Sequence, residues 1–105
     1  MQLVIIESPF AGDVEKNLEY ARFAMRDSLM RGESPYASHL LYTQEGVLND
    51  DDPDERTHGI QAGLAWGNVA DLVAVYADLG ISPGMQLGID THEAAGRKVE
   101  IRYIL

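Results

Sequence analysis

Two short segments combine small residues, polar residues and proline in a pattern that suits ligand binding. They are Ser8–Asp13 (SPFAGD) and Asp78–Met85 (DLGISPGM), and each follows an aliphatic run and precedes a helix-like stretch. In open α/β sheets, ligands bind at the carboxyl ends of strands, where these segments would lie. Ser82 followed by Pro83 also reads as a helix N-cap, and exposed amides at a helix start suit phosphate or another anion. The two segments therefore predict a pocket without identifying its ligand.

Several side chains in and near these segments are candidates for contacting a ligand. Phe10 would be a stacking wall for a base or sugar, although the same segment also fits a plain strand-to-helix turn capped by Asp13. Asn17 lies one turn into the helix and either reaches back over the pocket or faces solvent. His39 either hydrogen-bonds a ligand or acts as an acid, or is a satisfied polar residue at a strand end. The predicted ligand-binding residues are Ser8, Pro9, Phe10, Gly12, Asn17, His39, Asp78, Ser82, Gly84 and Met85.

Acidic residues are the candidates for catalytic groups near this pocket. Asp78 directly follows an apolar run and should lie near the pocket mouth, whereas Asp90 lies two turns into the following helix. Neither belongs to a close pair of carboxylates, so the spacing does not support a two-acid glycosidase mechanism. No Gly-x-Ser-x-Gly elbow, Walker loop or His-Glu-x-x-His motif is present. The two aspartates are weak catalytic candidates, and His58 and His92 are expected on helix surfaces without a specific role.

The acidic segment 49–55 carries enough charge for a hard cation but not the right ligand pattern. It lacks the alternating oxygen ligands and the glycine of an EF-hand loop. Asp52, Pro53 and Glu55 instead read as an N-cap, a first-turn proline and a capping-box glutamate. We therefore expect neither a metal ion nor a cofactor.

The composition describes one small acidic globular domain. The chain has 105 residues, of which 46% are hydrophobic, and this suffices for one modest core. It has no apolar run near the roughly 20 residues that span a bilayer, and its N-terminus reads as a strand rather than a signal peptide. The net charge of -9 opposes binding to DNA, RNA or anionic membranes. The absence of cysteine fits a cytoplasmic location.

Hydrophobic periodicity predicts the elements that position the candidate residues. We expect strands over 2–7, 35–41, 72–76 and 99–104, and helices between them over 13–31, 53–68 and 83–95. Helices between strands force parallel pairing with right-handed crossovers. The prediction is one α/β domain over residues 1–105, a small Rossmann-like three-layer fold with strand order 2-1-3-4 and helices on both faces. The switch point then falls between strands one and three, so the two opening segments face each other across one crevice.

Three glycines recur every four residues on one face of the second predicted helix. They are Gly59, Gly63 and Gly67, with Trp66 beside them. Glycine weakens a helix by up to ~1 kcal/mol relative to alanine, so this stripe indicates close approach to a sheet, a ligand or another subunit. We favour a subunit contact over packing within the chain, because a four-stranded sheet leaves edges and helix faces to cover. The chain is therefore predicted to form a homo-oligomer.

The short motifs together resemble the nucleoside 2-deoxyribosyltransferase-like superfamily, and in particular its small, uncharacterised bacterial and phage members. The resemblance spans nearly the whole chain and rests on residues 5–10 (IIESPF), Asn17, the Ala70-Asp71 pair and residues 82–85 (SPGM). It implies a compact Rossmann-like fold, assembly into dimers or larger rings, and binding of nucleosides, nucleotides or related ribosides at the carboxyl edge of the sheet. It also implies cleavage of an N-glycosidic bond by a glutamate nucleophile.

The chain departs from this family at two positions that carry its chemistry. Counting from Gly84, the family's aspartate falls at Ser82 and its nucleophilic glutamate at Gly88, and neither residue can act as acid or nucleophile. Asp90 is two helix positions further on, and each position turns about 100°, so its side chain should point elsewhere.

Three functions follow from this comparison of motifs. The first is binding of a nucleotide- or riboside-like molecule without turnover, as in a phage-type protein that sequesters a nucleotide signal. The second is an N-glycosidase or deoxyribosyltransferase with a relocated carboxylate such as Asp78 or Asp90. The third is a ligand-free interaction protein built on the glycine helix, which a crevice filled by Phe10 and Met85 would favour.

Overall fold

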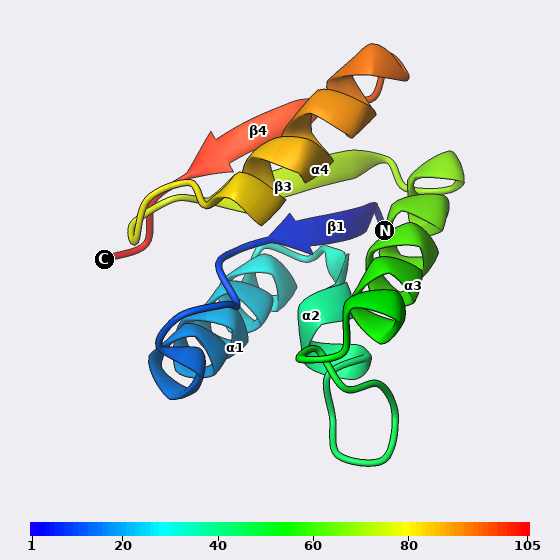
Figure 1. Cartoon of the computed structure of the whole chain (residues 1–105). Coiled ribbons are helices and arrows are strands. Elements are labelled where there is room, and N and C mark those ends of the chain that lie inside the picture. The colour runs from blue at the N-terminus through cyan, green and yellow to red at the C-terminus, as the bar shows by residue number, and fades with distance from the viewer.

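A computed structural model describes residues 1–105, and a four-stranded parallel sheet runs through its centre (Figure 1). The strands are β1 (Leu3–Glu7), β2 (Ser34–Tyr36), β3 (Leu72–Tyr76) and β4 (Val99–Arg102). They lie in the order β2-β1-β3-β4, and each neighbouring pair is parallel. The predicted strand order is confirmed, and the switch point lies between β1 and β3.

Four helices and one short turn connect the strands. They are α1 (Val14–Met30), α2 (Ser38–Leu41), α3 (Pro53–Ala65), the 3-10 turn η1 (Trp66–Asn68) and α4 (Pro83–Ala94). Helix α1 packs on one face of the sheet, whereas α4 packs on β3 and β4 and touches α3 (Figure 1). None of these helices has the length and apolar character needed to cross a membrane.

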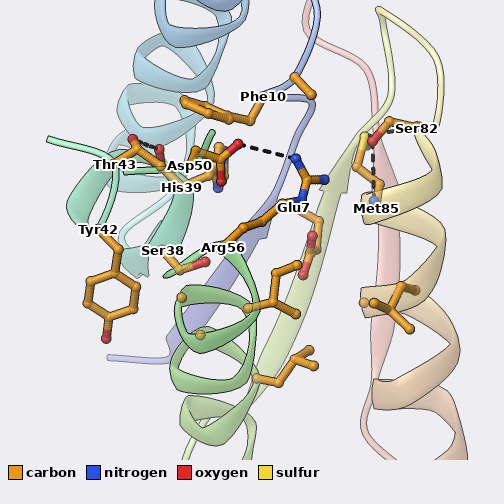
Figure 2. Close-up of a pocket in the computed structure, with 18 of the residues that line it drawn as sticks. Glu7, Phe10, Ser38, His39, Tyr42, Thr43, Asp50, Arg56, Ser82 and Met85 are labelled. Carbon is orange, nitrogen blue, oxygen red and sulfur yellow. Dashed lines mark hydrogen bonds and ion pairs between the residues drawn. The ribbon is translucent and has the colours of Figure 1, made fainter. Parts of the chain in front are cut away.

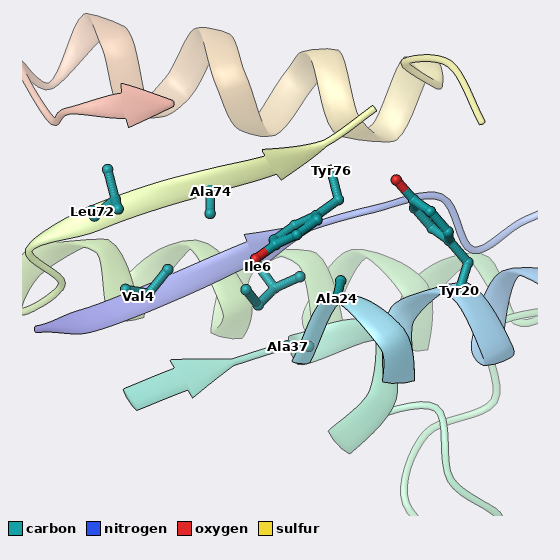
Figure 3. Close-up of a cluster of buried hydrophobic side chains, with 8 residues drawn as sticks. All are labelled: Val4, Ile6, Tyr20, Ala24, Ala37, Leu72, Ala74 and Tyr76. Carbon is teal, nitrogen blue, oxygen red and sulfur yellow. The ribbon is translucent and has the colours of Figure 1, made fainter. Parts of the chain in front are cut away.

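The core has two halves because successive strand residues point to opposite faces of the sheet. On β1, Val4 and Ile6 face α1, together with Tyr20 and Ala24 of that helix (Figure 3). Ile5 faces the other way and belongs to the cluster that contains the α4 side chains. All five residues of β3 are buried, as expected for an inner strand covered by helices on both faces.

The second predicted strand is wrong over most of its length. Strand β2 ends at Tyr36, and Ser38–Leu41 form the single helical turn α2 instead of continuing the strand. In the observed register Tyr36 lies opposite Ile5 and β1 ends at Glu7, so a strand running to residue 41 would have no partner over most of its added length. The chain therefore turns away from the sheet edge and carries His39 back over the end of β1.

The helix starts follow the predicted caps. The side chains of Asp13, Asp52 and Ser82 each accept a backbone N–H of the following first turn. The expected capping box of α3 is half formed, because the Glu55 carboxylate accepts the Asn49 N–H at 3.3 Å rather than the Asp52 N–H. These caps orient the starts of α1, α3 and α4 beside the carboxyl end of β1.

Candidate functional site

A cavity of about 320 Å³ lies at the carboxyl end of β1, between α2, α3 and the start of α4 (Figure 2). Its volume is at the lower end of the range of roughly 300 to 1,000 Å³ for small-molecule sites. Phe10 and Met85 stand on its walls and leave it open, so the filled crevice that would favour a ligand-free protein is not seen. A wider groove lined by residues 43–51 adjoins it and shares Phe10.

Glu7 extends its carboxyl group into this cavity from the last position of β1 (Figure 2). Its side chain is only 18% exposed, and burial raises the pKa of the carboxyl to about 7. A Cβ built on Gly88 would stand 2.6 Å from Glu7 Oε1, so the missing side chain at Gly88 leaves the space that this carboxyl fills. Sequence reasoning missed Glu7, although it is the first polar residue after a buried aliphatic run.

Ser8 and His39 form a hydrogen-bonded pair on the wall of the same cavity. Ser8 Oγ lies 2.6 Å from His39 Nε2, which joins the end of β1 to α2. Burial lowers the pKa of His39 to about 4, so its ring is neutral at physiological pH. The pair offers a ligand hydrogen-bonding groups without charge, and such a histidine is a poor acid at neutral pH.

The cavity carries more negative than positive charge. Its lining includes the carboxylates Glu7, Asp50 and Glu55, while Arg56 is its single Lys or Arg residue. Arg56 Nη1 already pairs with Asp50 Oδ2 at 3.2 Å (Figure 2). This balance favours an uncharged or cationic ligand over an anion.

The start of α4 lines the cavity but offers fewer free backbone amides for an anion than predicted. Ser82 Oγ accepts the Met85 N–H at 3.2 Å, and the Ser82 N–H points to Met85 Sδ at 3.4 Å. Pro83 has no N–H to offer. Only the Gly84 N–H among these residues has no partner within the chain, so one amide is free where several were expected.

Three predicted ligand-binding residues shape the loop after β1 instead of lining the cavity. Asn17 Nδ2 donates to the carbonyl oxygens of Phe10 at 2.9 Å and Ala11 at 3.1 Å. Gly12 has a φ of +102°, which a residue with a side chain rarely adopts, and it borders only the outer groove. Pro9 borders neither space. The bond from Asn17 fixes the backbone of Phe10, whose ring lines the cavity.

Both predicted catalytic aspartates lie outside the cavity. Burial works against the charge of Asp78, but hydrogen bonds from the Tyr20 hydroxyl and from the Ile104 and Leu105 amides lower its pKa overall. Its placement follows from strand alternation, because Asp78 comes two residues after Tyr76 and shares its α1 face, whereas the cavity is on the other face. Asp90 is exposed and accepts a hydrogen bond from Gln86.

The glycine stripe of α3 packs against the rest of the chain. A Cβ on Gly63 would meet Ser38 Oγ of α2 at 2.6 Å, and one on Gly67 would overlap the Arg97 guanidinium. Both glycines are buried within the chain by these contacts, and the predicted subunit contact stays a prediction. The Trp66 side chain beside them is 48% exposed and donates to the Tyr42 hydroxyl at 3.1 Å.

Comparisons with known proteins show which proteins share this fold. The profile of a family described as "Domain of unknown function (DUF7768)" matches residues 2–104, and a search of curated proteins finds no match. A 2-deoxyribosyltransferase from Bacillus psychrosaccharolyticus superposes with a TM-score of 0.66 at 17% identity, covering 96% of this chain and 72% of its own. A CMP N-glycosidase from Clostridium botulinum superposes with a TM-score of 0.57 at 16% identity, covering 97% and 71%. These similarities confirm the 2-deoxyribosyltransferase-like fold.

Proposed function

We propose that this chain, which belongs to the DUF7768 family, binds a nucleoside or a closely related N-riboside in the cavity beside Glu7. The observation that carries the proposal is the placement of this cavity at the switch point between β1 and β3. Open α/β sheets bind their ligands at this point. The solved neighbours of the same fold, a 2-deoxyribosyltransferase and a CMP N-glycosidase, make a riboside the natural ligand class.

The lining groups match the two halves of a nucleoside. Sugar hydroxyls are donors and acceptors, and the Glu7 carboxylate and the Ser8–His39 pair provide complementary groups at the inner end. Phe10 at the mouth offers a ring face for the base, and stacking of a base on an aromatic side chain contributes roughly 1–3 kcal/mol. Met85 adds apolar surface to the lining.

The charge balance supports a nucleoside rather than a nucleotide. A phosphate group would meet Glu7, Asp50 and Glu55, and it would have to compete with Asp50 for Arg56. The start of α4 offers one free amide to offset this repulsion. We therefore propose an uncharged riboside as the preferred ligand.

Thermal-shift measurements with nucleosides and their matched 5′-monophosphates test this proposal. We expect nucleosides to raise the Tm, since a ligand at 100 times its Kd stabilises the folded state by about 2.7 kcal/mol, and we expect the monophosphates to raise it less. Gly84→Leu should abolish the shift while the fold survives, because a Cβ at Gly84 meets nothing closer than Ser82 Oγ at 4.0 Å. Gln86→Leu, on the exposed side of the same helix, is the control. An unchanged nucleoside shift in folded Gly84→Leu would reject this site.

A second candidate function, cleavage of the N-glycosidic bond, is favoured by Glu7 alone. Its carboxylate would displace the base from the anomeric carbon, and the base would leave with the bonding electron pair and take up a proton. Water would then release the sugar and restore the carboxylate. Binding without turnover stays the first candidate because the other acidic and basic groups that line the cavity are engaged: His39 is bonded to Ser8, Asp50 is paired with Arg56, and Glu55 accepts the Asn49 N–H.

Chromatography of incubated nucleosides distinguishes these two functions. Release of free base by the wild-type protein that disappears in Glu7→Gln would establish the cleavage reaction. Intact nucleoside together with a clear thermal shift would establish binding without turnover.

A further inference from the structure

His92 lies directly behind Glu7 and is completely buried. It belongs to the inner face of α4 with Met85, Gly88 and Ile89, which contradicts the expected surface position. Its Nε2 has no hydrogen-bond partner within the chain, although buried polar atoms are nearly always paired. This nitrogen stands 3.9 Å from Glu7 Oε1. An unpaired ring nitrogen is thus aimed at the carboxyl group that enters the cavity.

Arg97 fixes the state of the His92 ring. Arg97 Nη1 lies 2.9 Å from His92 Nδ1, and a guanidinium can only donate, so Nδ1 accepts this hydrogen bond. The neutral ring must then carry its proton on Nε2, the nitrogen that faces Glu7. A protonated ring would bring an Nδ1–H against the Arg97 donor, and burial together with Arg97 lowers the pKa of His92.

Arg97 is itself held in place on its other side. Its Nη2 donates to Asn68 Oδ1 at 3.0 Å, and its guanidinium lies over Gly67, where any side chain would collide with it. A chain of contacts therefore runs from the end of η1 through Arg97 and His92 to the cavity. Gly88 completes the arrangement, since it allows the Glu7 carboxyl to approach α4 just one turn before His92.

We propose that His92 is a positioning residue for Glu7: Arg97 holds the neutral ring so that the Nε2–H faces the Glu7 carboxyl, orients it toward the ligand and favours its ionised form. The distance of 3.9 Å exceeds a hydrogen bond, and a small rotation of the Glu7 carboxyl would shorten it to one. This role rests on the proposed function only in that Glu7 faces the ligand. The Arg97–His92–Glu7 arrangement itself exists without ligand.

The other charged and titratable groups of the cavity do not take this role. Arg56 of α3 is paired with Asp50, and His39 of α2 is bonded to Ser8. Glu55 at the start of α3 accepts the Asn49 N–H. His92 of α4 is the one basic group within 4.0 Å of the Glu7 carboxylate.

The tautomer of His92 is a direct test in the unaltered protein. A long-range ¹H–¹⁵N spectrum of the histidine rings should show His92 as the neutral Nε2–H form at pH 7. A ring protonated on Nδ1, or charged at pH 7, would overturn the proposal. No ligand enters this measurement, so failure of nucleoside binding would leave its result unaffected.

The titration of Glu7, followed through its ¹³C carboxyl signal, tests the consequence. His92→Phe keeps a ring but removes the donor, so the Glu7 midpoint should rise by roughly half a unit to one unit. His58→Phe, at an exposed position of α3, is the matched control and should leave the midpoint unchanged. An unchanged midpoint in folded His92→Phe would refute the positioning role.

The variant Arg97→Met provides a second test, in which the His92 side chain is kept. Without the Arg97 donor, His92 can also take a proton on Nδ1, pair with the Glu7 carboxylate as a cation and lower the Glu7 midpoint. If the tautomer and the midpoint both stay as in the wild type, Arg97 does not control the ring and the proposal fails.

Discussion

Two titratable side chains on the cavity wall respond to pH in opposite directions. Burial raises the pKa of Glu7 to about 7, so the folded state holds this proton more tightly than the unfolded chain does. The contribution of Glu7 to the free energy of unfolding is therefore fully present below its unfolded pKa near 4.5, and it is lost as the pH rises toward 7. Burial lowers the pKa of His39 to about 4, so its contribution is full above 6.5 and is lost as pH falls toward 4. The two slopes oppose each other over the shared window of about pH 4.5 to 6.5.

Replacing Glu7 by glutamine should expose the combined slope of His39 and of His92, whose pKa is also lowered. We expect the free energy of unfolding of Glu7→Gln to rise between pH 4.5 and 6.5, and that of the wild type to rise less. At pH 8 the variant should be more stable by about 2 to 3 kcal/mol, because a buried carboxylate has been removed. Urea unfolding at pH 5, 6.5 and 8 measures both effects. Glu19→Gln on exposed α1 surface controls for the change in net charge, and a Glu7→Gln protein less stable than wild type at pH 8 would contradict the burial effect.

The residues of the candidate site differ in how far the sequence could reveal them. His92 stands seven positions after Met85 on the apolar face of α4, so helical periodicity alone could have placed it inside. Glu7 could not be singled out, because one carboxyl at a strand end is equally compatible with solvent. Asp78 was misplaced because alternation assigns it a face only once the face that holds the cavity is known.

At the scale of elements, the α2–α3 contact shapes the outer wall of the cavity. Gly63 of α3 lets Ser38 of α2 approach so closely that a Cβ would lie 2.6 Å from its Oγ. Gly59, one turn earlier, faces only the flexible end of Leu48 at 3.2 Å. The two positions therefore differ in their need for glycine, although they occupy the same face of one helix.

Alanine at these two positions should have opposite effects on stability. Gly63→Ala should lower the free energy of unfolding by roughly 1–3 kcal/mol through overpacking against α2. Gly59→Ala should be neutral or stabilising by up to ~1 kcal/mol, because alanine is the better helix former. Chemical denaturation of both variants measures the difference. In the double variant Ser38→Gly/Gly63→Ala much of the lost free energy of unfolding should be recovered. If the double variant is as unstable as Gly63→Ala, the strain lies elsewhere than at Ser38.

The elements themselves were predictable where a single pattern dominated. Strand β3 has the predicted bounds because Leu72–Tyr76 is an uninterrupted apolar run that begins directly after Asp71. The prediction of one strand over residues 35–41 is wrong because this region contains the end of a three-residue strand and a four-residue helix. Each is too short to show a hydrophobic period. Helix α2 also has no side-chain cap to announce its start.

The whole molecule leaves surfaces that a second copy would cover. Strands β2 and β4 are the two edges of the sheet, and Ile101 and Trp66 are each about half exposed. The net charge of -9 opposes association only weakly at physiological salt, where the Debye length is about 8 Å. An apolar contact between copies is therefore compatible with the charge.

We predict that the purified chain is a homo-oligomer at tens of micromolar. Of the predicted contact residues Gly59, Gly63, Trp66 and Gly67, the two glycines at 63 and 67 are buried, and half-exposed Trp66 offers the largest side chain for such a contact. Light scattering of the wild type should give a mass above that of one chain, and Trp66→Ser should reduce it. A mass of one chain would contradict the prediction. An oligomer that persists in Trp66→Ser would show that the contact does not involve Trp66.

Two walls of the cavity differ in how readily they open by local unfolding. Glu7 belongs to β1, which pairs with a strand on each side, whereas α2 is four residues long and contains no buried residue. Segments with few buried contacts open locally at low free energy, while central strands open only with the whole fold. For the proposed ligand we therefore expect exchange through the α2 side, and we expect Glu7 on the β1 side to contribute most to ligand choice. Substitutions in α2 should then change mainly the residence time, and substitutions at Glu7 mainly the preferred ligand.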